Sequence, residues 1–244
     1  MEEPQIILCI PGKWKNKSEM IEMIIRSSDE FVLIGNRIVK LDNLNMNYEI
    51  EIYGHDENLA EAFEIAGGNA FTKEQLNEIQ NHFLTAYLIG NGGTIDNLIK
   101  LIEVSNVLLK AGGLGVKVEV SGTATTPESW SIINSKKEIP ETFKAFVTVA
   151  EEDDFYYTCG MHCFGLPDVI TFKNQVSIEY AQELMQIFCL YNLIEKPYLE
   201  DGSTFSLAEE HPIFVLRYSD CRHIPEDHLF YNKYGVWALA HKFE

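Results

Sequence analysis

The chain has 244 residues, of which 46% are hydrophobic and 23% charged, and these fractions are ordinary for a folded globular protein. Its formal net charge of −18 argues against binding to nucleic acid or to an anionic membrane, because both would be repelled over most of the surface. No apolar run reaches the roughly 18 residues that would be needed to span a bilayer.

The first third of the chain predicts a mixture of strands and short helices. Pro11-Gly12 ends the opening strand, and Ser18 is expected to cap the first helix. An Asn-rich turn at 42–45 joins two strands that we expect to be antiparallel, and Asp56 or Asn58 is expected to cap the helix after them. The predicted elements are a strand at 5–10, a helix at 18–26, strands at 31–41 and 48–53, a helix at 59–66 and a helical turn from Thr72.

A strand, a glycine loop, a long apolar helix and a second strand form the centre of the prediction. The strand 83–89 ends at Gly90, Thr94 can cap the helix that follows, and Gly112-Gly113 stops it before a strand at 114–120. The helix is apolar on more than half of its circumference, so a sheet and another element must cover it. The pattern predicts a βαβ unit with a core helix.

The remaining residues predict a second group of elements. Pro127 at the first helical position starts a helix, and the polar segment 135–140 is the best candidate for a linker. Four acidic residues at 151–154 suit a charged hairpin turn, and Ser177 is expected to cap a long helix. Strands are expected at 143–149, 155–163, 168–172, 203–207, 212–218 and 234–240, and helices at 126–134 and 177–194.

The fold class follows from these elements. We expect an α+β (α/β) protein with mixed β-sheets, a central βαβ unit and helices packed on the sheets. Two halves related in structure are expected at 1–136 and 137–244, with one compact domain over 1–244 as the alternative. The acidic start Met1–Pro4 is unlike a secretory signal, and five cysteines do not form an even set. We therefore expect reduced thiols and a cytoplasmic protein.

The glycine loop is one candidate site. Gly90, Gly92, Gly93 and Thr94 stand at the start of a helix, where free backbone amides and the helix dipole favour an anion. The loop matches neither the phosphate-loop motif nor the dinucleotide fingerprint. A turn required by the structure is the alternative, and it explains the same glycines.

A group of soft ligands is the other candidate site. Cys159, His162 and Cys163 lie within five residues, and Cys221 and His223 offer two more metal ligands. Strand alternation would place both cysteines of the first group opposite His162, which argues against a local metal site. The same cysteines, paired with a histidine, would be the nucleophile of a cysteine enzyme. We expect no cofactor.

Two stretches of sequence resemble a known family. The first is Leu108 to Trp130, with Ala-Gly-Gly-Leu-Gly-Val before a strand and Thr-Pro-Glu-Ser-Trp at a helix start. The second contains Tyr-Thr-Cys-Gly-Met at 157–161 and Phe-Gly-Leu-Pro-Asp at 164–168. Both resemble the bacterial family catalogued as domain of unknown function 4261. The resemblance implies an α+β protein and assigns no residue a role.

A shorter resemblance concerns Tyr156 to Val169, which is similar to suppressor-of-fused-like domains, several of which resemble immunity proteins that neutralise toxins. That resemblance implies protein binding, and the charge of −18 would suit a basic partner. We therefore expect a bacterial protein that binds another protein without catalysis. A metal-dependent or cysteine-based enzyme acting on a small molecule is the alternative. A catalytic pocket with converging groups would favour the enzyme.

Overall fold

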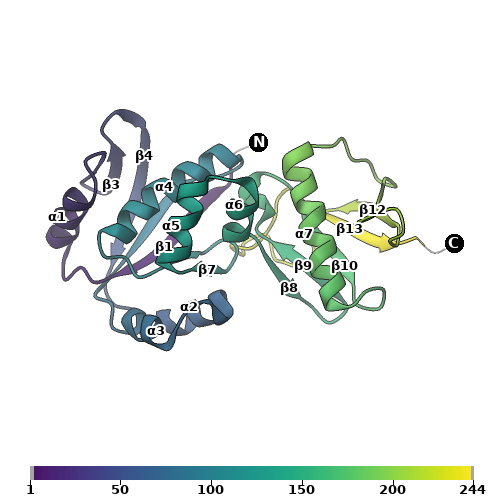
Figure 1. Cartoon of the computed structure of the whole chain (residues 1–244), viewed down its shortest axis with the longest axis horizontal. Helices are drawn as coiled ribbons and strands as arrows, with labels where there is room; N and C mark the ends of the chain where they lie inside the picture. Colours follow the sequence, from purple (N-terminus) through teal and green to yellow (C-terminus); the bar gives the residue numbers. More distant parts are fainter. Residues whose placement is uncertain (1–2, 243–244) are drawn as a thin grey trace.

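The computed structural model describes residues 3–242 and consists of two β-sheets with helices packed on them (Figure 1). Met1 and Glu2, on which the expectation about a secretory signal partly depends, lie outside that range. The first sheet contains, in spatial order, β2 (Phe31–Ile34), β3 (Arg37–Lys40), β4 (Asn43–Tyr53), β5 (Leu84–Asn91), β1 (Gln5–Gly12), β6 (Val116–Val118) and β7 (Thr123–Thr125). The second contains β11 (Thr204–Phe205), β12 (Phe214–Ser219), β13 (Val236–His241), β10 (Asp168–Phe172), β9 (Phe155–Cys159) and β8 (Thr148–Glu151).

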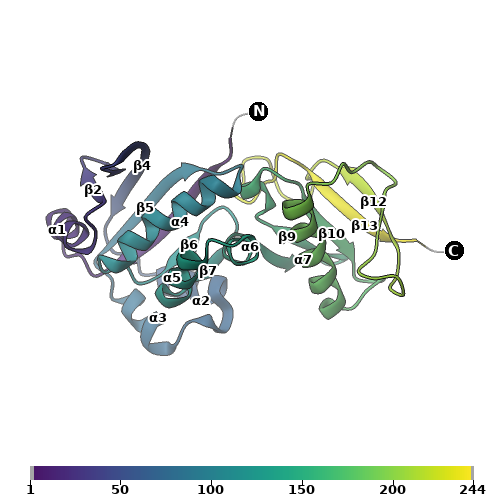
Figure 2. The ribbon, with the colours of Figure 1, turned by 45° about the horizontal axis from the view of Figure 1, so that its top comes forward.

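The helices lie mainly on one side of each sheet (Figure 2). Hydroxyl groups at Thr72, Thr94, Thr126 and Ser177 cap four of them, as the sequence predicts, and each accepts a backbone N–H three residues further on. The α-helices are α1 (Lys17–Ser27), α2 (Leu59–Gly67), α3 (Lys73–Gln80), α4 (Ile95–Lys110), α5 (Pro127–Lys136), α6 (Ile139–Phe146) and α7 (Ile178–Glu195), and short 3-10 helices lie at η1 (Gly68–Ala70) and η2 (Met161–Phe164). None of the helices in residues 3–242 has the length and apolar composition needed to cross a membrane.

The expected α+β class and mixed sheets are confirmed. In the central βαβ unit, a further strand lies between the two predicted strands. β5, α4 and β6 follow one another in the chain, but β1 lies between β5 and β6 and pairs antiparallel with both. β5 and β6 are therefore parallel to each other without being neighbours. All neighbours in the first sheet are antiparallel, whereas β10 and β13 form a parallel pair in the second. The first sheet is thus antiparallel throughout, and the second is mixed.

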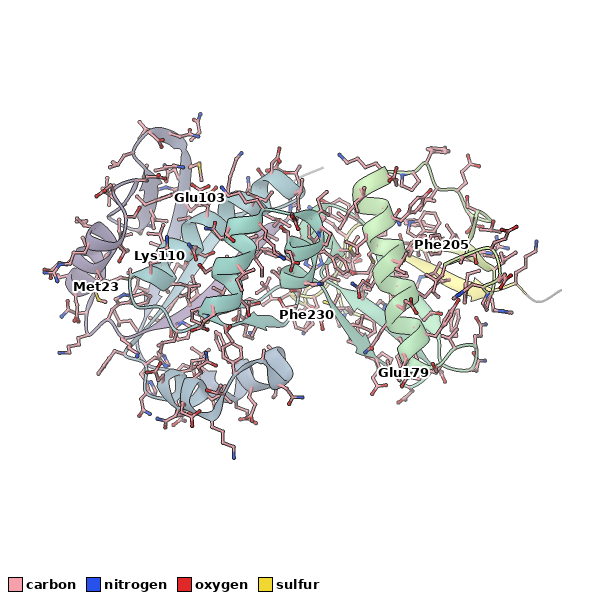
Figure 3. The ribbon with its side chains drawn as sticks, viewed as in Figure 1. Met23, Glu103, Lys110, Glu179, Phe205 and Phe230 are labelled. Carbon is pink, nitrogen blue, oxygen red and sulfur yellow. The ribbon has the colours of Figure 1, made fainter. Side chains whose placement is uncertain are left out.

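The two faces of the first sheet are covered differently. Ile6, Leu8 and Ile10 of β1 face a large core that includes α4, whereas Cys9 faces a small core with α2 and α3. Because side chains alternate along a strand, neighbouring residues of β1 belong to opposite faces. The large core continues from α4 through α6 to α7, so buried hydrophobic residues of both halves form one cluster. Figure 3 labels Phe230, which lies where the two halves meet.

Several local predictions were wrong. Asn58 stands at the N-cap of α2 but makes no side-chain capping hydrogen bond, and residues 43–45 of the expected turn belong to β4. Asn16 caps α1 instead of Ser18, and its side chain accepts the N–H of Glu19. The expected strand 31–41 is interrupted by a two-residue turn at Gly35-Asn36. Residues 143–146 belong to α6, which buries Phe143 and Phe146 at helical spacing. The expected strand 155–163 ends at Cys159, because Gly160 adopts a positive φ of 122° and η2 follows it.

The segment expected to be a linker is a tight connection between two helices. Lys137 adopts the left-handed conformation, with φ 54°, and ends α5 immediately before α6. Its neighbour Lys136 forms an ion pair with Glu141 at 2.9 Å. The second sheet begins only at Thr148, so α6 connects the two sheets.

Candidate functional site

The glycine loop at the end of β5 is a packing contact between the two halves. The N–H of Gly92 donates to the carbonyl of Pro4 at 2.8 Å, and the N–H of Gly93 donates to the carbonyl of Cys163 at 2.8 Å. A Cβ atom at Gly92 would lie 2.7 Å from that same Cys163 oxygen. The premise of free amides is therefore wrong for Gly92 and Gly93, and close packing accounts for their lack of a side chain. Thr94 caps α4, and Gly90 is paired within the sheet.

The cysteines and histidines of the second candidate site are only partly brought together. Cys221 Sγ lies 3.8 Å from His223 Nδ1, and the His223 ring packs against Tyr157 at a centroid distance of 4.8 Å. Within residues 3–242, no group of three or more His, Cys, Asp and Glu side chains could hold a metal ion. Burial raises the pKa of the Cys159 and Cys163 thiols, so neither supplies a thiolate nucleophile at neutral pH.

His162 lines a hollow of about 430 Å³ between residues 3–7 and the loop 226–233, and no cysteine among the described residues lines that hollow. Burial lowers its pKa to about 4, so the ring is neutral at pH 7. Both ring nitrogens are enclosed by protein atoms, and the backbone of Val120 is the polar group beside the ring.

A buried carboxylate holds the turn that carries these residues. Asp168 Oδ1 accepts the hydroxyl of Thr158 at 3.0 Å and the N–H of Met161 at 3.1 Å, and Oδ2 accepts the side-chain amide of Asn232 at 2.6 Å. Burial raises the pKa of Asp168 to about 7, and the hydrogen bonds oppose that shift. Asn232 also donates to the carbonyl of Leu166 at 3.0 Å. Asp168 therefore fixes both ends of η2, and its role is structural. The sequence analysis did not single it out.

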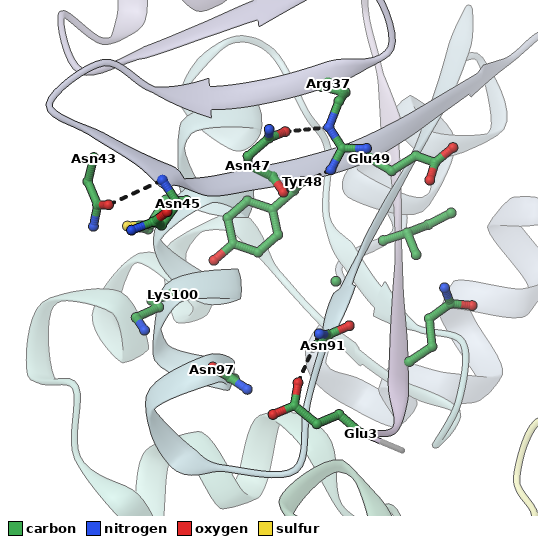
Figure 4. Close-up of a pocket in the computed structure, with 14 residues that line it drawn as sticks. Glu3, Arg37, Asn43, Asn45, Asn47, Tyr48, Glu49, Asn91, Asn97 and Lys100 are labelled. Atoms are coloured by element: carbon green, nitrogen blue, oxygen red, sulfur yellow. Dashed lines mark hydrogen bonds between the residues drawn. The ribbon is translucent and has the colours of Figure 1, made fainter.

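An asparagine-lined hollow of about 400 Å³ lies between the β3–β4 hairpin and the start of α4 (Figure 4). Most of its amides bond to neighbouring protein groups. Asn47 holds the guanidinium of Arg37, Asn91 donates to Glu3 at 2.9 Å, and Asn97 donates to the carbonyl of Gly92 at 2.8 Å. Asn43 accepts the N–H of Asn45 at 3.3 Å. These bonds stabilise the local backbone, so the presence of the asparagines is explained without a bound ligand.

A groove on the uncovered part of the first sheet is the site with the most distinctive chemistry. We call it the acidic groove; it has a volume of about 600 Å³ and is lined by Ile7, Glu51, Tyr53, Gly54, His55, Asp56, Thr85, Tyr87, Ile89, Glu119 and Leu229. Strands β4, β5 and β1 supply its floor, the loop before α2 supplies one wall, and Leu229 comes from the C-terminal half. Its lining includes three carboxylates and, among the described residues, no lysine or arginine.

The floor of the acidic groove is set by strand register. Glu51 pairs with Tyr87 across β4 and β5, and Tyr87 pairs with Cys9 across β5 and β1. Paired residues point to the same face, so Glu51 and Tyr87 share the face opposite α4. The next row brings Ile7 against Ile89 on the same face. In β4, acidic residues alternate with isoleucines, as in Glu49, Ile50, Glu51 and Ile52, and this pattern predicts one solvent-exposed face. The other walls of the groove come from segments that are distant in the chain, and no local sequence pattern connects them.

The charges in the acidic groove are only partly compensated. Glu119 forms an ion pair with Lys117 at 2.6 Å, and both side chains are largely buried. Asp56 accepts the backbone N–H of Asn58 at 2.9 Å, which is a local turn contact. Glu51 is exposed, and its Oε2 accepts the hydroxyl of Tyr53 at 2.8 Å. The groove therefore carries negative charge beside aromatic and aliphatic surface.

One part of the chain is similar to a known protein family. Residues 157–227 match the family model described as Domain of unknown function (DUF4261). This stretch resembles that family, and we call it the DUF4261 segment. It contains the motifs at 157–161 and 164–168, so the resemblance proposed from them is confirmed. The stretch Leu108 to Trp130 lies outside the match, and its resemblance stays a prediction. No curated protein and no solved structure matches the chain.

The DUF4261 segment contributes no lining residue to the acidic groove. It begins in β9 and contains η2, β10, α7 and β12, whereas the groove is lined by residues of the first sheet and by Leu229. Its two motifs build η2 and the start of β10, where Gly160, Gly165 and Asp168 have structural roles. The family match therefore covers α7 and part of the second sheet, without β8 and β13, and it assigns no chemistry to them.

Proposed function

We propose that this protein recognises a basic protein partner and binds it through the acidic groove, without catalysis. The observation that carries the proposal is the lining of the groove, in which Glu51, Asp56 and Glu119 lie beside Tyr53 and Tyr87. Carboxylates next to aromatic rings attract lysine and arginine side chains by charge and by cation–π contact. An immunity-type role, in which the partner is a toxin, is one form of this function.

Long-range electrostatics support the same partner. The net charge of −18 attracts a basic protein over several ångströms before contact and repels acidic ones. Apolar side chains from Ile7, Ile89 and Leu229 line the groove between the charges, and Leu229 is 53% exposed. A partner that covers these side chains would gain hydrophobic contact in addition to charge pairing. Charge would steer the encounter, and the apolar floor would stabilise the complex.

The chemistry of the cysteines also favours binding over catalysis. A cysteine enzyme needs a thiolate next to a base, but Cys159 and Cys163 are buried and their thiols have raised pKa values. Their neighbour His162 is likewise enclosed and has no thiol partner among the described hydrogen bonds. These features support the choice of a binding function over the enzyme alternative.

Affinity capture from an extract of the source cells tests the proposal. The wild-type chain and two charge-reversed variants, Glu51→Lys in the groove and Glu209→Lys on a distant exposed loop, would serve as baits. We expect wild type and Glu209→Lys to retain the same basic protein and Glu51→Lys to lose it. Equal capture by both variants, or capture of an acidic protein only, would contradict the proposal.

A further inference from the structure

We propose that the acidic groove contains a guanidinium subsite, formed by Tyr53, Tyr87 and Glu51, that takes an arginine side chain of the partner. This inference rests on the proposed function and names the chemical group that is recognised. The three residues come from two neighbouring strands, β4 and β5, so their relative positions are set by sheet register. The subsite is consequently part of a rigid element.

The two tyrosine rings present an aromatic surface of fixed shape. Their centroids lie 5.5 Å apart, and the ring planes meet at 83°, so they pack edge to face. Tyr53 is 55% exposed, whereas Tyr87 is partly buried against the sheet. In an edge-to-face pair, at least one ring keeps a face open to a ligand. A planar cation can stack on that face.

Glu51 supplies the negative charge at the edge of this aromatic surface. Its Oε2 accepts the hydroxyl of Tyr53 at 2.8 Å, which orients the carboxylate relative to the ring. That hydrogen bond is also the main cause of the raised pKa of Tyr53. A carboxylate held beside an aromatic face matches the two ways in which a guanidinium binds, by paired N–H bonds and by stacking.

The geometry favours arginine over lysine. A lysine ammonium is a compact and strongly hydrated charge, and it cannot form two parallel hydrogen bonds with a carboxylate. A guanidinium is planar and weakly hydrated, so it loses less hydration on an aromatic surface. The aliphatic stem of an arginine would lie along Ile89 and Leu229, which line the same groove.

A titration with single amino-acid derivatives tests the inference on the intact chain. The ligands are Nα-acetyl-arginine amide, the lysine derivative and the citrulline derivative, which has the shape of arginine without its charge. The readout is the NMR signals of the Tyr53 and Tyr87 rings, assigned through the Tyr53→Phe and Tyr87→Phe variants. We expect the arginine derivative to bind with a dissociation constant of about 1 mM. Lysine should bind roughly fivefold more weakly, and citrulline should leave the signals unchanged.

Matched variants test the contributions of Glu51 and Tyr53 to the subsite. Glu51→Gln and Tyr53→Leu should each weaken arginine binding about tenfold, which corresponds to one charged hydrogen bond or one cation–π contact. Glu209→Gln and Tyr198→Leu change exposed residues outside the groove and should leave binding unchanged. Circular dichroism on all four variants would confirm that the fold is intact.

The outcomes separate this inference from the proposed function. Equal binding of arginine, lysine and citrulline, or equal affinity in Glu51→Gln and wild type, would overturn the subsite. Capture of a basic protein that depends on Glu51, without binding of the arginine derivative, would also overturn the subsite and leave the proposed function standing. Arginine binding without any captured protein would support the subsite and contradict the proposed function.

Discussion

Two regions of this protein contrast in how their polar groups are used. In the turn 160–168, the carboxylate of Asp168 is buried and accepts hydrogen bonds from Thr158, Met161 and Asn232. In the acidic groove, the carboxylate of Glu51 is exposed and bonds to one neighbouring hydroxyl. The buried carboxylate stabilises the fold, whereas the exposed one is available to a partner.

The contrast also separates the family match from the proposed binding site. The turn 160–168 lies inside the DUF4261 segment, whereas every lining residue of the acidic groove lies outside residues 157–227. Residues that hold a turn are constrained by backbone geometry and by buried hydrogen bonds. A sequence motif of this kind therefore indicates a fold. The binding site has to be identified from the side chains on the protein surface.

The largest expected effect is at Gly160. Its φ of 122° is unfavourable for other residues, and a Cβ atom there would lie 2.0 Å from the carbonyl oxygen of Phe146. Gly160→Ala should lower the free energy of unfolding by roughly 4 kcal/mol or prevent folding, as measured by urea denaturation.

Gly35 offers the matched control for that variant. It also has a positive φ, 61°, but a Cβ atom there would meet nothing within 4 Å. Gly35→Ala should cost only about 1 kcal/mol, the backbone strain alone. Similar losses at both positions would mean that the contact with Phe146 is unimportant.

Removal of the buried carboxylate should have the next largest effect. Asp168→Ala leaves the Thr158 hydroxyl, the Met161 N–H and the Asn232 amide without their acceptor, which should cost roughly 2–4 kcal/mol. Asp153→Ala, in the exposed hairpin turn, should change stability by less than about 0.5 kcal/mol. Equal stability of the two variants in urea denaturation would refute the structural role of Asp168.

The same carboxylate should give the protein a characteristic pH dependence. Burial raises the pKa of Asp168 from 3.8 to about 7 in the folded state, so the folded protein holds this proton more tightly than the unfolded chain. Its contribution to stability is fully present below about pH 4 and is lost as the pH rises through about 7. Because other carboxylates titrate in the opposite sense, the measurement is the difference in unfolding free energy between wild type and Asp168→Asn from pH 4 to 8. A difference that does not change with pH would show that the pKa is not raised.

The smallest effect on stability is expected in the acidic groove. Glu51 is exposed, and its hydrogen bond to Tyr53 lies at the surface, so Glu51→Gln should change the free energy of unfolding by less than about 0.5 kcal/mol. The melting temperature should stay within about 2 °C of wild type. A loss comparable to that of Asp168→Ala would mean that Glu51 supports the fold, and the contrast between the two regions would fail.

Local sequence signals predicted much of the fold. Hydroxyl caps at Thr94, Thr126 and Ser177 located helix starts because an N-cap is a contact within four residues. The segment 143–149 was assigned as a strand because a short apolar run looks the same in a buried helix and a buried strand. The position of β1 between β5 and β6 depends on contacts about 80 residues apart in the chain, which no local pattern encodes.

The candidate sites show the same division. The glycines at 92 and 93 were noticed, but their reason is a contact with Cys163, about 70 residues away in the chain. Cys159 and Cys163 were placed on one strand because the positive φ of Gly160 that ends the strand has no unique sequence signature. The alternation of acidic and apolar residues around Glu51 was the only feature of the sequence that indicated part of the groove, namely an exposed face of β4. Nothing in the sequence indicated that Leu229 would form the opposite wall.

Binding of a short basic peptide at several salt concentrations tests the central claim most directly. The probe is a nine-residue peptide of alternating arginine and serine, measured against wild type, Glu51→Lys and Glu209→Lys, which change the net charge equally. We expect wild type and Glu209→Lys to bind with similar affinity, Glu51→Lys to bind at least about tenfold more weakly, and all binding to weaken with salt. If both variants lose affinity equally, the peptide responds to net charge alone, and the acidic groove is not the binding site.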